Sequence, residues 1–308
     1  MSKNISIIIP VCNEKNNVPV MVNALRSVMQ TLHYSYLITF VDDGSTDGTL
    51  EVIRQEAAAD EHVRYISFSR NFGHQNALKA GIDTCEADCM ICMDGDMQHP
   101  PDMIPEMLRL WETGYDIVYT IRKDHIEIPK MKRESSRMFY NMLNRLSDIE
   151  LESGAADFRL IDQKVVQELR RFKEEDLFWR GLIKWSGYKQ ISIEYEPGVR
   201  KEGRTKYTYK KMMQFALRGI TSFSVKPLNI AIYLGFIFSF ASLLYFPYAI
   251  ISYYMGATRP GWTSIIVTIA FFGGLQLMVL GIIGLYLGKL FTQSKQRPHY
   301  LIKESNLQ

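Results

Sequence analysis

The chain has 308 residues, which is enough for one large domain and a further element. Its formal net charge of +3 and its isoelectric point of about 8.5 exclude a strongly basic nucleic-acid-binding protein and an acidic disordered chain. The charge is unevenly distributed, because nearly all charged residues lie before Pro227.

Strands and helices alternate in the first 120 residues. Short apolar runs predict strands, and longer runs with helical periodicity predict the helices between them. The predicted strands are 5–11, 36–41, 63–68, 89–93 and 116–120, and the predicted helices are 18–32, 46–59, 75–84 and 100–112. This βαβα series predicts a largely parallel sheet with helices on both faces, which is a nucleotide-binding architecture.

The middle third of the chain is less regular. It predicts a basic amphipathic helix at 128–146, a strand at 154–161, a helix at 163–172 and a strand at 191–199. The segment 209–223 is basic, aromatic and amphipathic. We expect it to lie in the plane of lipid headgroups, directly before the apolar part of the chain.

Two uncharged runs follow, at 227–258 and at 261–288, and only Arg259 interrupts them. Each run exceeds the roughly 20 residues that a helix needs to cross a bilayer. We therefore predict membrane helices at about 228–254 and 263–289 rather than two buried core helices. Lysine and arginine residues precede the first run and follow the second, which places both termini in the cytoplasm by the positive-inside rule.

The N-terminal residues lead directly into the first strand pattern without a signal-peptide pattern. We therefore expect the soluble part to stay in the cytoplasm, where it is made, attached to the inner (cytoplasmic) membrane by a multi-pass anchor. Cys89 and Cys92 have a spacing found in zinc and redox sites. Because Cys92 falls within a predicted strand and no second pair has ligand spacing, we interpret the cysteines as buried apolar thiols.

Asp94-Gly95-Asp96 follows the predicted strand 89–93, so its two carboxylates should lie at the carboxyl edge of the sheet, where ligands bind. Carboxylates at this position suit Mg²⁺ or Mn²⁺ bound together with the phosphates of a substrate. The alternative is a solvated acidic turn. Asp42 and Asp43 follow the strand 36–41 in the same way. A carboxylate there can accept hydrogen bonds from a ribose or a base, or it can merely cap the turn.

Several motifs together resemble family 2 glycosyltransferases of the GT-A fold, in the branch that uses polyprenyl phosphates. The resemblance is greatest to bactoprenol glucosyltransferases and weaker to dolichyl-phosphate mannose synthases. It covers almost the whole chain and rests on the segments 8–14, 41–47, 69–75, 94–98, 157–160, 178–181 and 204–207. The chain departs from the branch pattern at Met97-Gln98-His99 and at Cys12-Asn13-Glu14-Lys15, both near the expected donor pocket, so the transferred sugar stays open.

The resemblance implies roles for the matching residues. Asp96 would bind the metal directly, Asp94 would lie between metal and ribose, and Asp157 would act at the sugar or acceptor, either as a base or by positioning. On its sequence alone, Asp157 could simply pair with Arg159. The implied nucleotide-sugar residues are Pro10, Glu14, Asp42, Asp43, Asp94, Gln98 and Arg122, and those for the acceptor phosphate are Arg200, Arg204, Lys206 and Tyr207. His74 and His99 are interpreted as ordinary surface or turn histidines.

We therefore expect a GT-A catalytic domain at 1–208, a juxtamembrane segment at 209–226, a two-helix transmembrane hairpin within 227–291 and a cytoplasmic tail at 292–308. The resemblance implies inverting transfer of a hexose, with glucose from UDP-glucose as the best expectation, to undecaprenyl phosphate. Alternative donors are UDP-N-acetylhexosamine, UDP-aminoarabinose and GDP-mannose, and a non-catalytic membrane scaffold is the alternative of a different class. No nucleic-acid partner is expected. Glycines in the second span would permit close helix packing within or between subunits.

Overall fold

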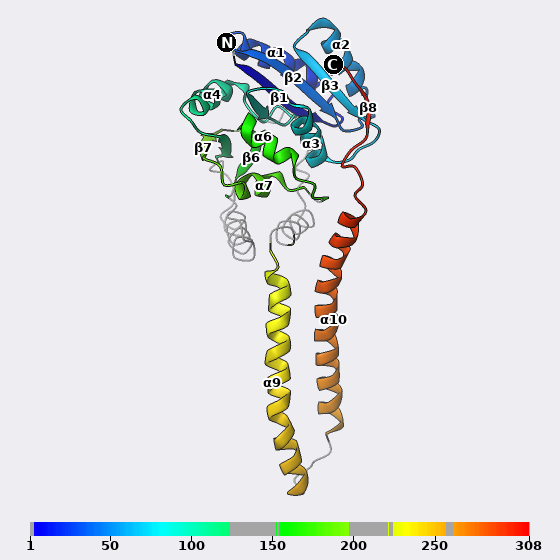
Figure 1. Ribbon diagram of the computed structural model, residues 1–308. Helices are drawn as coiled ribbons and strands as arrows, with labels where there is room; N and C mark the ends of the chain where they lie inside the picture. Colours follow the sequence, from blue (N-terminus) through cyan, green and yellow to red (C-terminus); the bar gives the residue numbers. More distant parts are fainter. Residues whose placement is uncertain are drawn as a thin grey trace.

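The computed structural model describes residues 3–123, 152, 154–175, 177–196, 221, 224–256 and 261–307. Figure 1 shows a head built around one twisted sheet, with two long helices projecting side by side from it. The predicted helix 128–146 lies outside the described residues, and so does the predicted segment 209–223 apart from residue 221. The same holds for Arg200, Arg204, Lys206 and Tyr207, whose acceptor-phosphate role stays a prediction.

The head contains an eight-stranded sheet in the order β7-β5-β6-β4-β1-β2-β3-β8. Strands β1 to β4 are mutually parallel, as predicted, but the sheet is mixed, because β6 is antiparallel to both β4 and β5, and β8 is antiparallel to β3. The strands are β1 Asn4–Val11, β2 Ser35–Asp42, β3 Val63–Phe68, β4 Cys89–Cys92, β5 Ile117–Arg122, β6 Ala155–Asp162, β7 Gln190–Tyr195 and β8 Ile302–Ser305.

Helices cover both faces of this sheet, which confirms the predicted layering. On one face, α1, α2 and α4 pack over alternate strand residues such as Ile7 and Ile9. On the other face, α3, α6 and α7 pack over the intervening residues, including Ile8. The helices are α1 Asn17–Met29, α2 Thr49–Ala59, α3 His74–Thr84, α4 Ile104–Glu112, α6 Gln163–Arg170 and α7 Trp179–Trp185.

The predicted helix 100–112 is divided in two. A 3₁₀ helix at Pro101–Met103 (η1) precedes α4, and the N–H of Ile104 bonds to the carbonyl of Pro101 in the tighter 3₁₀ pattern. Pro105 has no N–H to continue an α-helical bond to that carbonyl. The first turn therefore closes as a 3₁₀ helix, and the regular α-helix begins only after it.

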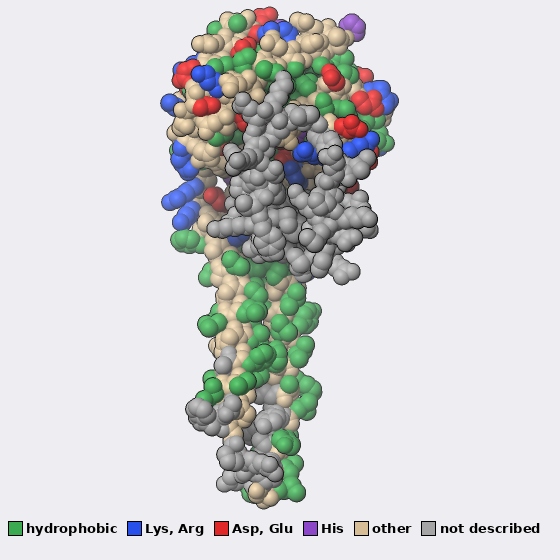
Figure 2. Space-filling view, turned by 180° about the vertical axis from the view of Figure 1, so that it is seen from behind, with side chains coloured by type: hydrophobic (Ala, Val, Ile, Leu, Met, Phe, Trp, Pro, Cys, Tyr) green, Lys and Arg blue, Asp and Glu red, His purple; other side chains and the backbone are tan. Residues whose placement is uncertain are grey.

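The two long helices are α9 Lys226–Tyr254, with 29 residues, and α10 Trp262–Ser294, with 33 residues. At about 1.5 Å per residue, either length is enough to cross the roughly 30 Å hydrocarbon layer. Within the described residues, Ser264–Ser294 is the one stretch both long and apolar enough to count as a candidate span. The apolar stretch Lys226–Ala241 of α9 is too short to count as one. Exposed apolar side chains occur along the length of both helices, and Figure 2 shows them on one face.

The chain beyond α10 returns to the head, where the sequence predicted only a tail. Strand β8 pairs with the edge strand β3, and the Tyr300 ring stacks on Phe68 with 5.1 Å between ring centroids. The Tyr300 hydroxyl donates to Asp83 Oδ2 at 3.0 Å, and Asn306 Oδ1 accepts the Tyr65 N–H at 2.6 Å. The end of α10 is therefore tied to the head through β8 and Tyr300.

Deleting residues 300–308 should destabilise this sheet edge by roughly 2–4 kcal/mol, because several hydrogen bonds worth about 1 kcal/mol each are lost with the Tyr300 stack. Hydrogen exchange of the purified protein should become faster at β3 amides and stay slow in β1. Lys303→Ala, an exposed change in the same strand, is the control. Unchanged exchange in β3 after the deletion would show that β8 does not stabilise the sheet.

Candidate active site

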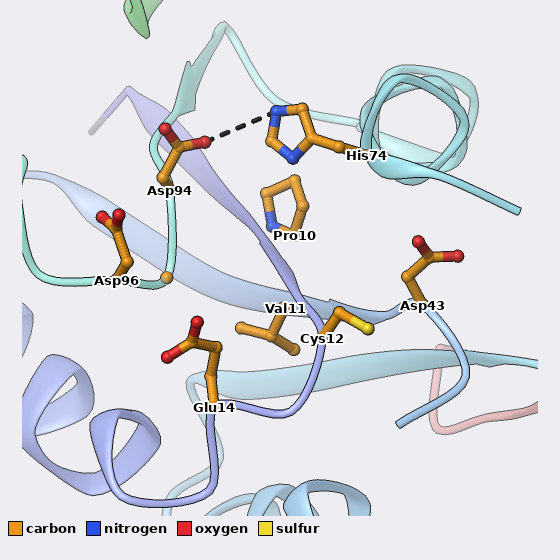
Figure 3. A pocket seen from close by; sticks show the side chains of 9 residues that line it. Pro10, Val11, Cys12, Glu14, Asp43, His74, Asp94 and Asp96 are labelled. Carbon is orange, nitrogen blue, oxygen red and sulfur yellow. Dashed lines mark ion pairs between the residues drawn. The ribbon is translucent and has the colours of Figure 1, made fainter. Parts of the chain in front are cut away.

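The carboxyl ends of β1, β2 and β4 meet at one edge of the sheet. Because the three strands are parallel neighbours, the loops that follow them open onto a common cavity. The cavity measures about 180 Å³. Its lining consists of Pro10, Val11, Cys12, Glu14, Asp43, His74, Asp94, Gly95 and Asp96 (Figure 3).

The Asp94–Asp96 turn lies tightly against β1. A Cβ on Gly95 would lie 2.6 Å from Val11 Cγ1 and 3.2 Å from the Pro10 carbonyl oxygen, so only glycine lets the turn come this close. Beyond it, Gln98 donates from its backbone N–H to Asp96 Oδ1 at 3.1 Å and from Nε2 to Asp96 Oδ2 at 2.7 Å. These bonds hold the Asp96 carboxylate at the cavity wall.

His99 fixes the other acid of the pair. Its Nδ1 accepts the backbone N–H of Asp94 at 3.0 Å, so the ring proton belongs on Nε2, which lies 3.7 Å from Asp94 Oδ2. The ring is buried and stacks on Phe158 at 5.2 Å, and this burial lowers the pKa of His99. His99 is thus a neutral, hydrogen-bonded turn histidine, in line with its sequence interpretation.

The two acids at the end of β2 have different surroundings. Asp42 is 1% exposed, and its carboxylate accepts the Ser45 N–H at 3.1 Å and the Ser67 hydroxyl at 2.8 Å. Asp43 lines the cavity and accepts the N–H groups of Phe72, at 2.6 Å, and Gly73, at 2.9 Å. Burial raises the pKa of Asp43, against the opposing effect of these N–H groups. The structure therefore brings Asp43, and not Asp42, to the cavity.

Asp157 lies behind the cavity on β6, next to β4. Arg180 donates two hydrogen bonds to the Asp157 carboxylate, from Nε at 2.9 Å and from Nη2 at 3.1 Å. Arg159 Nη2 donates a third at 3.0 Å. Burial alone would raise the pKa of Asp157, but the two guanidinium groups outweigh it and hold the pKa far below the ordinary value. The pairing with Arg159 considered from the sequence is present, and Arg180 is an additional partner that the sequence did not reveal.

His74 connects Asp157 to the cavity. Its Nε2 lies 3.4 Å from Asp94 Oδ1 and 3.8 Å from Asp157 Oδ2, and Figure 3 shows the ring turned toward Asp94. The sequence pattern indicated only an ordinary surface or turn histidine at this position. A signal was present, because His74 begins the helix that follows β3 and so belongs to the same sheet edge as the acids.

Gln98 and Arg122 extend the site without lining the cavity. Arg122 Nη1 donates to Gln98 Oε1 at 3.0 Å, and Gln98 in turn holds Asp96. Of the predicted nucleotide-sugar and metal residues, the structure brings five to the cavity, namely Pro10, Glu14, Asp43, Asp94 and Asp96.

The sequence comparisons identify the family. The glycosyl transferase family 2 profile matches residues 6–170. The chain belongs to glycosyl transferase family 2. It is therefore a transferase enzyme, and its cavity lies in the part of the chain that carries the family match.

Relatives match this family 2 enzyme along almost its whole length. It is 39% identical over 308 residues to the uncharacterized glycosyltransferase YkcC of Bacillus subtilis, covering 99% of this chain and 95% of the relative. It is 36% identical over 300 residues to the bactoprenol glucosyl transferase of Shigella phage SfV, covering 97% of this chain and 98% of the relative.

Solved structures confirm the GT-A fold. The mannosyltransferase PcManGT of Pyrobaculum calidifontis, solved with GDP-Man and Mn²⁺, matches with a TM-score of 0.50 and 14% identity, over 93% of this chain and 88% of its own. The mannosyl-3-phosphoglycerate synthase of Rubrobacter xylanophilus matches with a TM-score of 0.51 and 14% identity, over 71% of this chain and 73% of its own.

Two carboxylates in the cavity of this glycosyltransferase are of the ligand type that Mg²⁺ and Mn²⁺ prefer. Asp94 and Asp96 offer hard carboxylate oxygens from one turn. Among the described residues, no three His, Cys, Asp or Glu side chains are grouped to hold a metal on their own. A cation here would need further oxygens from a substrate phosphate or water, which is the usual arrangement for Mg²⁺.

The cysteines fit the interpretation as buried thiols, with one exception. Cys85, Cys89 and Cys92 are free and buried, and burial raises the pKa of Cys92 to about 12, which disfavours the thiolate that a metal site requires. Cys12 differs because it is partly exposed and lines the cavity.

Proposed function

We propose that this family 2 enzyme transfers a hexose, with glucose from UDP-glucose as the first candidate, to a polyprenyl phosphate. One observation carries the proposal. Five predicted donor and metal residues line a single cavity in a chain that matches a bactoprenol glucosyl transferase over 97% of its length. A non-catalytic scaffold has no need for carboxylates gathered at one sheet edge.

The donor would lie across the cavity with its diphosphate toward Asp94 and Asp96. We propose that Asp96 is a direct metal ligand and that Asp94 is shared between metal and ribose. Asp43, with Pro10 and Glu14, would contact the nucleoside. A bound Mg²⁺ or Mn²⁺ supplies positive charge that stabilises the departing diphosphate. The Mn²⁺ reported in PcManGT agrees with this chemistry.

Gln98 and Arg122 would assist at the diphosphate, since Arg122 reaches Asp96 through Gln98. The predicted contact of Asp42 with the base or ribose is less direct. Its carboxylate is held by Ser45 and Ser67, so Asp42 would act by shaping the loop that presents Asp43.

The acceptor explains why this site needs no strong base. A phosphate monoester is already anionic near neutral pH, so its oxygen can attack the anomeric carbon without losing a proton first. The new carbon–oxygen bond forms as the bond to the UDP β-phosphate breaks, and a single displacement of this kind inverts the anomeric configuration. Catalysis then consists of positioning the two reactants and neutralising phosphate charge.

The two long helices are proposed to form a membrane hairpin with the head in the cytoplasm. Strand β8 ties the end of α10 to the same head from which α9 departs. If α10 crosses the bilayer, α9 must therefore cross it in the opposite direction. The bactoprenol substrate in the names of the relatives also calls for a site close to the inner (cytoplasmic) membrane.

The purified enzyme is expected to move radiolabel from UDP-[¹⁴C]glucose into the lipid phase when it is given undecaprenyl phosphate and Mg²⁺. Chelation with EDTA should stop the transfer, and undecaprenol, which has no phosphate, should not be labelled. UDP-N-acetylhexosamine, UDP-aminoarabinose and GDP-mannose are tested in parallel, because the donor sugar is the open part of the proposal. If no donor labels the lipid, the proposed function is wrong.

A further inference from the structure

Helix α7 lies between the active site and the membrane hairpin. It lies on the side of the head from which α9 and α10 project (Figure 1). The segment before it contacts the end of α10, where Gln293 Oε1 accepts the Glu175 N–H at 2.7 Å and Gln293 Nε2 donates to the Lys173 carbonyl at 2.8 Å. A lipid acceptor arriving from the membrane therefore approaches the site past this helix.

The start of α7 is fixed to the edge of the active site. Trp179 is buried, and its indole N–H donates to the Gln75 carbonyl at 2.9 Å. Its backbone N–H donates to Gln75 Oε1 at 3.2 Å. Gln75 adjoins His74, which lines the cavity. Arg180, the next residue of α7, is thereby held close to the reacting groups.

Two arginines share one carboxylate at this point. Arg159 and Arg180 both pair with Asp157. The side chain of Arg159 is 6% exposed, whereas that of Arg180 is 30% exposed. Of the two guanidinium groups, that of Arg180 is therefore the more accessible to a ligand.

We propose that Arg180 binds the phosphate of the lipid acceptor and that Asp157 is a positioning residue that holds the Arg180 guanidinium. This inference rests on the proposed function and names a further residue for its acceptor. The bonding pattern separates the two arginines. Arg122 is linked through Gln98 to Asp96, on the donor side. Arg180 is instead linked through Asp157 and His74 to Asp94, and it belongs to α7, the helix on the side of the head from which α9 and α10 project (Figure 1).

Arg180→Ala should raise the KM for undecaprenyl phosphate by roughly 10- to 100-fold, the usual effect of losing a charged hydrogen bond, and change the KM for UDP-glucose less than about twofold. Arg180→Lys should give a KM for undecaprenyl phosphate between those of the wild type and Arg180→Ala. Lysine keeps the positive charge but lacks the planar guanidinium group that binds a phosphate through two hydrogen bonds. Arg109→Ala, which removes an exposed arginine from α4, is the matched control and should leave both KM values unchanged.

Asp157→Asn should also weaken acceptor use, and the double variant with Arg180→Ala should be no worse than Arg180→Ala alone, because both changes disable one unit. If Asp157 were instead a general base, its loss would lower kcat without raising the acceptor KM, and the two changes would add. If Asp157→Asn fails to fold because Arg159 is left unpaired, the Arg180 variants decide.

Binding without turnover separates this inference from the proposed function. Calorimetric titration with farnesyl phosphate, a short acceptor, should give weaker binding to Arg180→Ala than to the wild type, whereas farnesol should not distinguish the two. Equal binding of farnesyl phosphate, or an unchanged KM for undecaprenyl phosphate, would overturn the role of Arg180 even if the wild type transfers sugar. An enzyme that transfers no sugar but loses farnesyl phosphate binding in Arg180→Ala would refute the donor reaction and keep the phosphate site.

Discussion

Asp96→Asn is expected to reduce sugar transfer by at least about 10³-fold while leaving the fold intact. The change removes one carboxylate from the proposed metal site, and a catalytic cation supplies several kcal/mol of stabilisation to the departing diphosphate. The backbone N–H of Gln98 can still donate to the remaining side-chain oxygen. Lipid labelling measures transfer, and titration with Mn²⁺ and UDP measures whether metal-dependent binding is lost with it.

The control for this variant is Asp102→Asn, which makes the same change on an exposed residue of η1, outside the cavity. It should transfer sugar at the wild-type rate. Full activity in Asp96→Asn, or unchanged binding of Mn²⁺ with UDP, would remove Asp96 from the proposed metal site. Loss of secondary structure by circular dichroism would instead show that Asp96 is needed for folding.

Gly44→Ala should destabilise the head by about 3 kcal/mol or more and abolish donor binding. Gly44 has a φ of +65°, which strains any residue with a side chain, and an added Cβ would lie 2.6 Å from the Asn71 nitrogen. The neighbouring backbone is the one whose N–H groups, at Phe72 and Gly73, hold the Asp43 carboxylate. Thermal unfolding should show a fall of several degrees in Tm, and calorimetry with UDP measures donor binding.

The control variant Gly187→Ala distinguishes backbone strain at a positive φ from the steric clash of an added Cβ. Gly187 has a similar φ of +72°, but no atom lies within 4 Å of the position of an added Cβ. The Gly187→Ala variant should lose only about 1 kcal/mol of unfolding free energy, because only backbone strain is added, and it should still bind UDP. Equal losses in the two variants would mean that the contact between the loops after β2 and β3 does not stabilise the site.

Local sequence patterns predicted the first half of the head well. The apolar runs at 5–11, 63–68 and 89–93 are strands β1, β3 and β4 to within a residue, because a buried parallel strand is marked by its own residues. The direction of the less regular elements was harder to predict. Nothing within the segment of β6 indicates that it runs antiparallel to β4, since that depends on the course of the chain between them.

The sequence predicted which strand ends carry the acids of the candidate site. It did not predict which of these side chains line the cavity. Acids after β2 and β4 had to lie at one sheet edge, and the structure places Asp43, Asp94 and Asp96 there. Asp42 and Asp43 are neighbours in sequence. Only the positions of Ser67 and Gly73 decide which carboxylate is buried in hydrogen bonds within the head and which lines the cavity.

The sequence by itself determined the family motifs, the acidic strand ends and the long apolar runs, because each is written in residues that lie close together in the chain. Only the tertiary structure decided the partners over long separations. It joined Asp157 to Arg180, set His74 beside Asp94 and returned β8 to β3 after the hairpin. Such pairings depend on strand order and helix packing. The local preference of a segment for helix or strand does not indicate which distant segment it will contact.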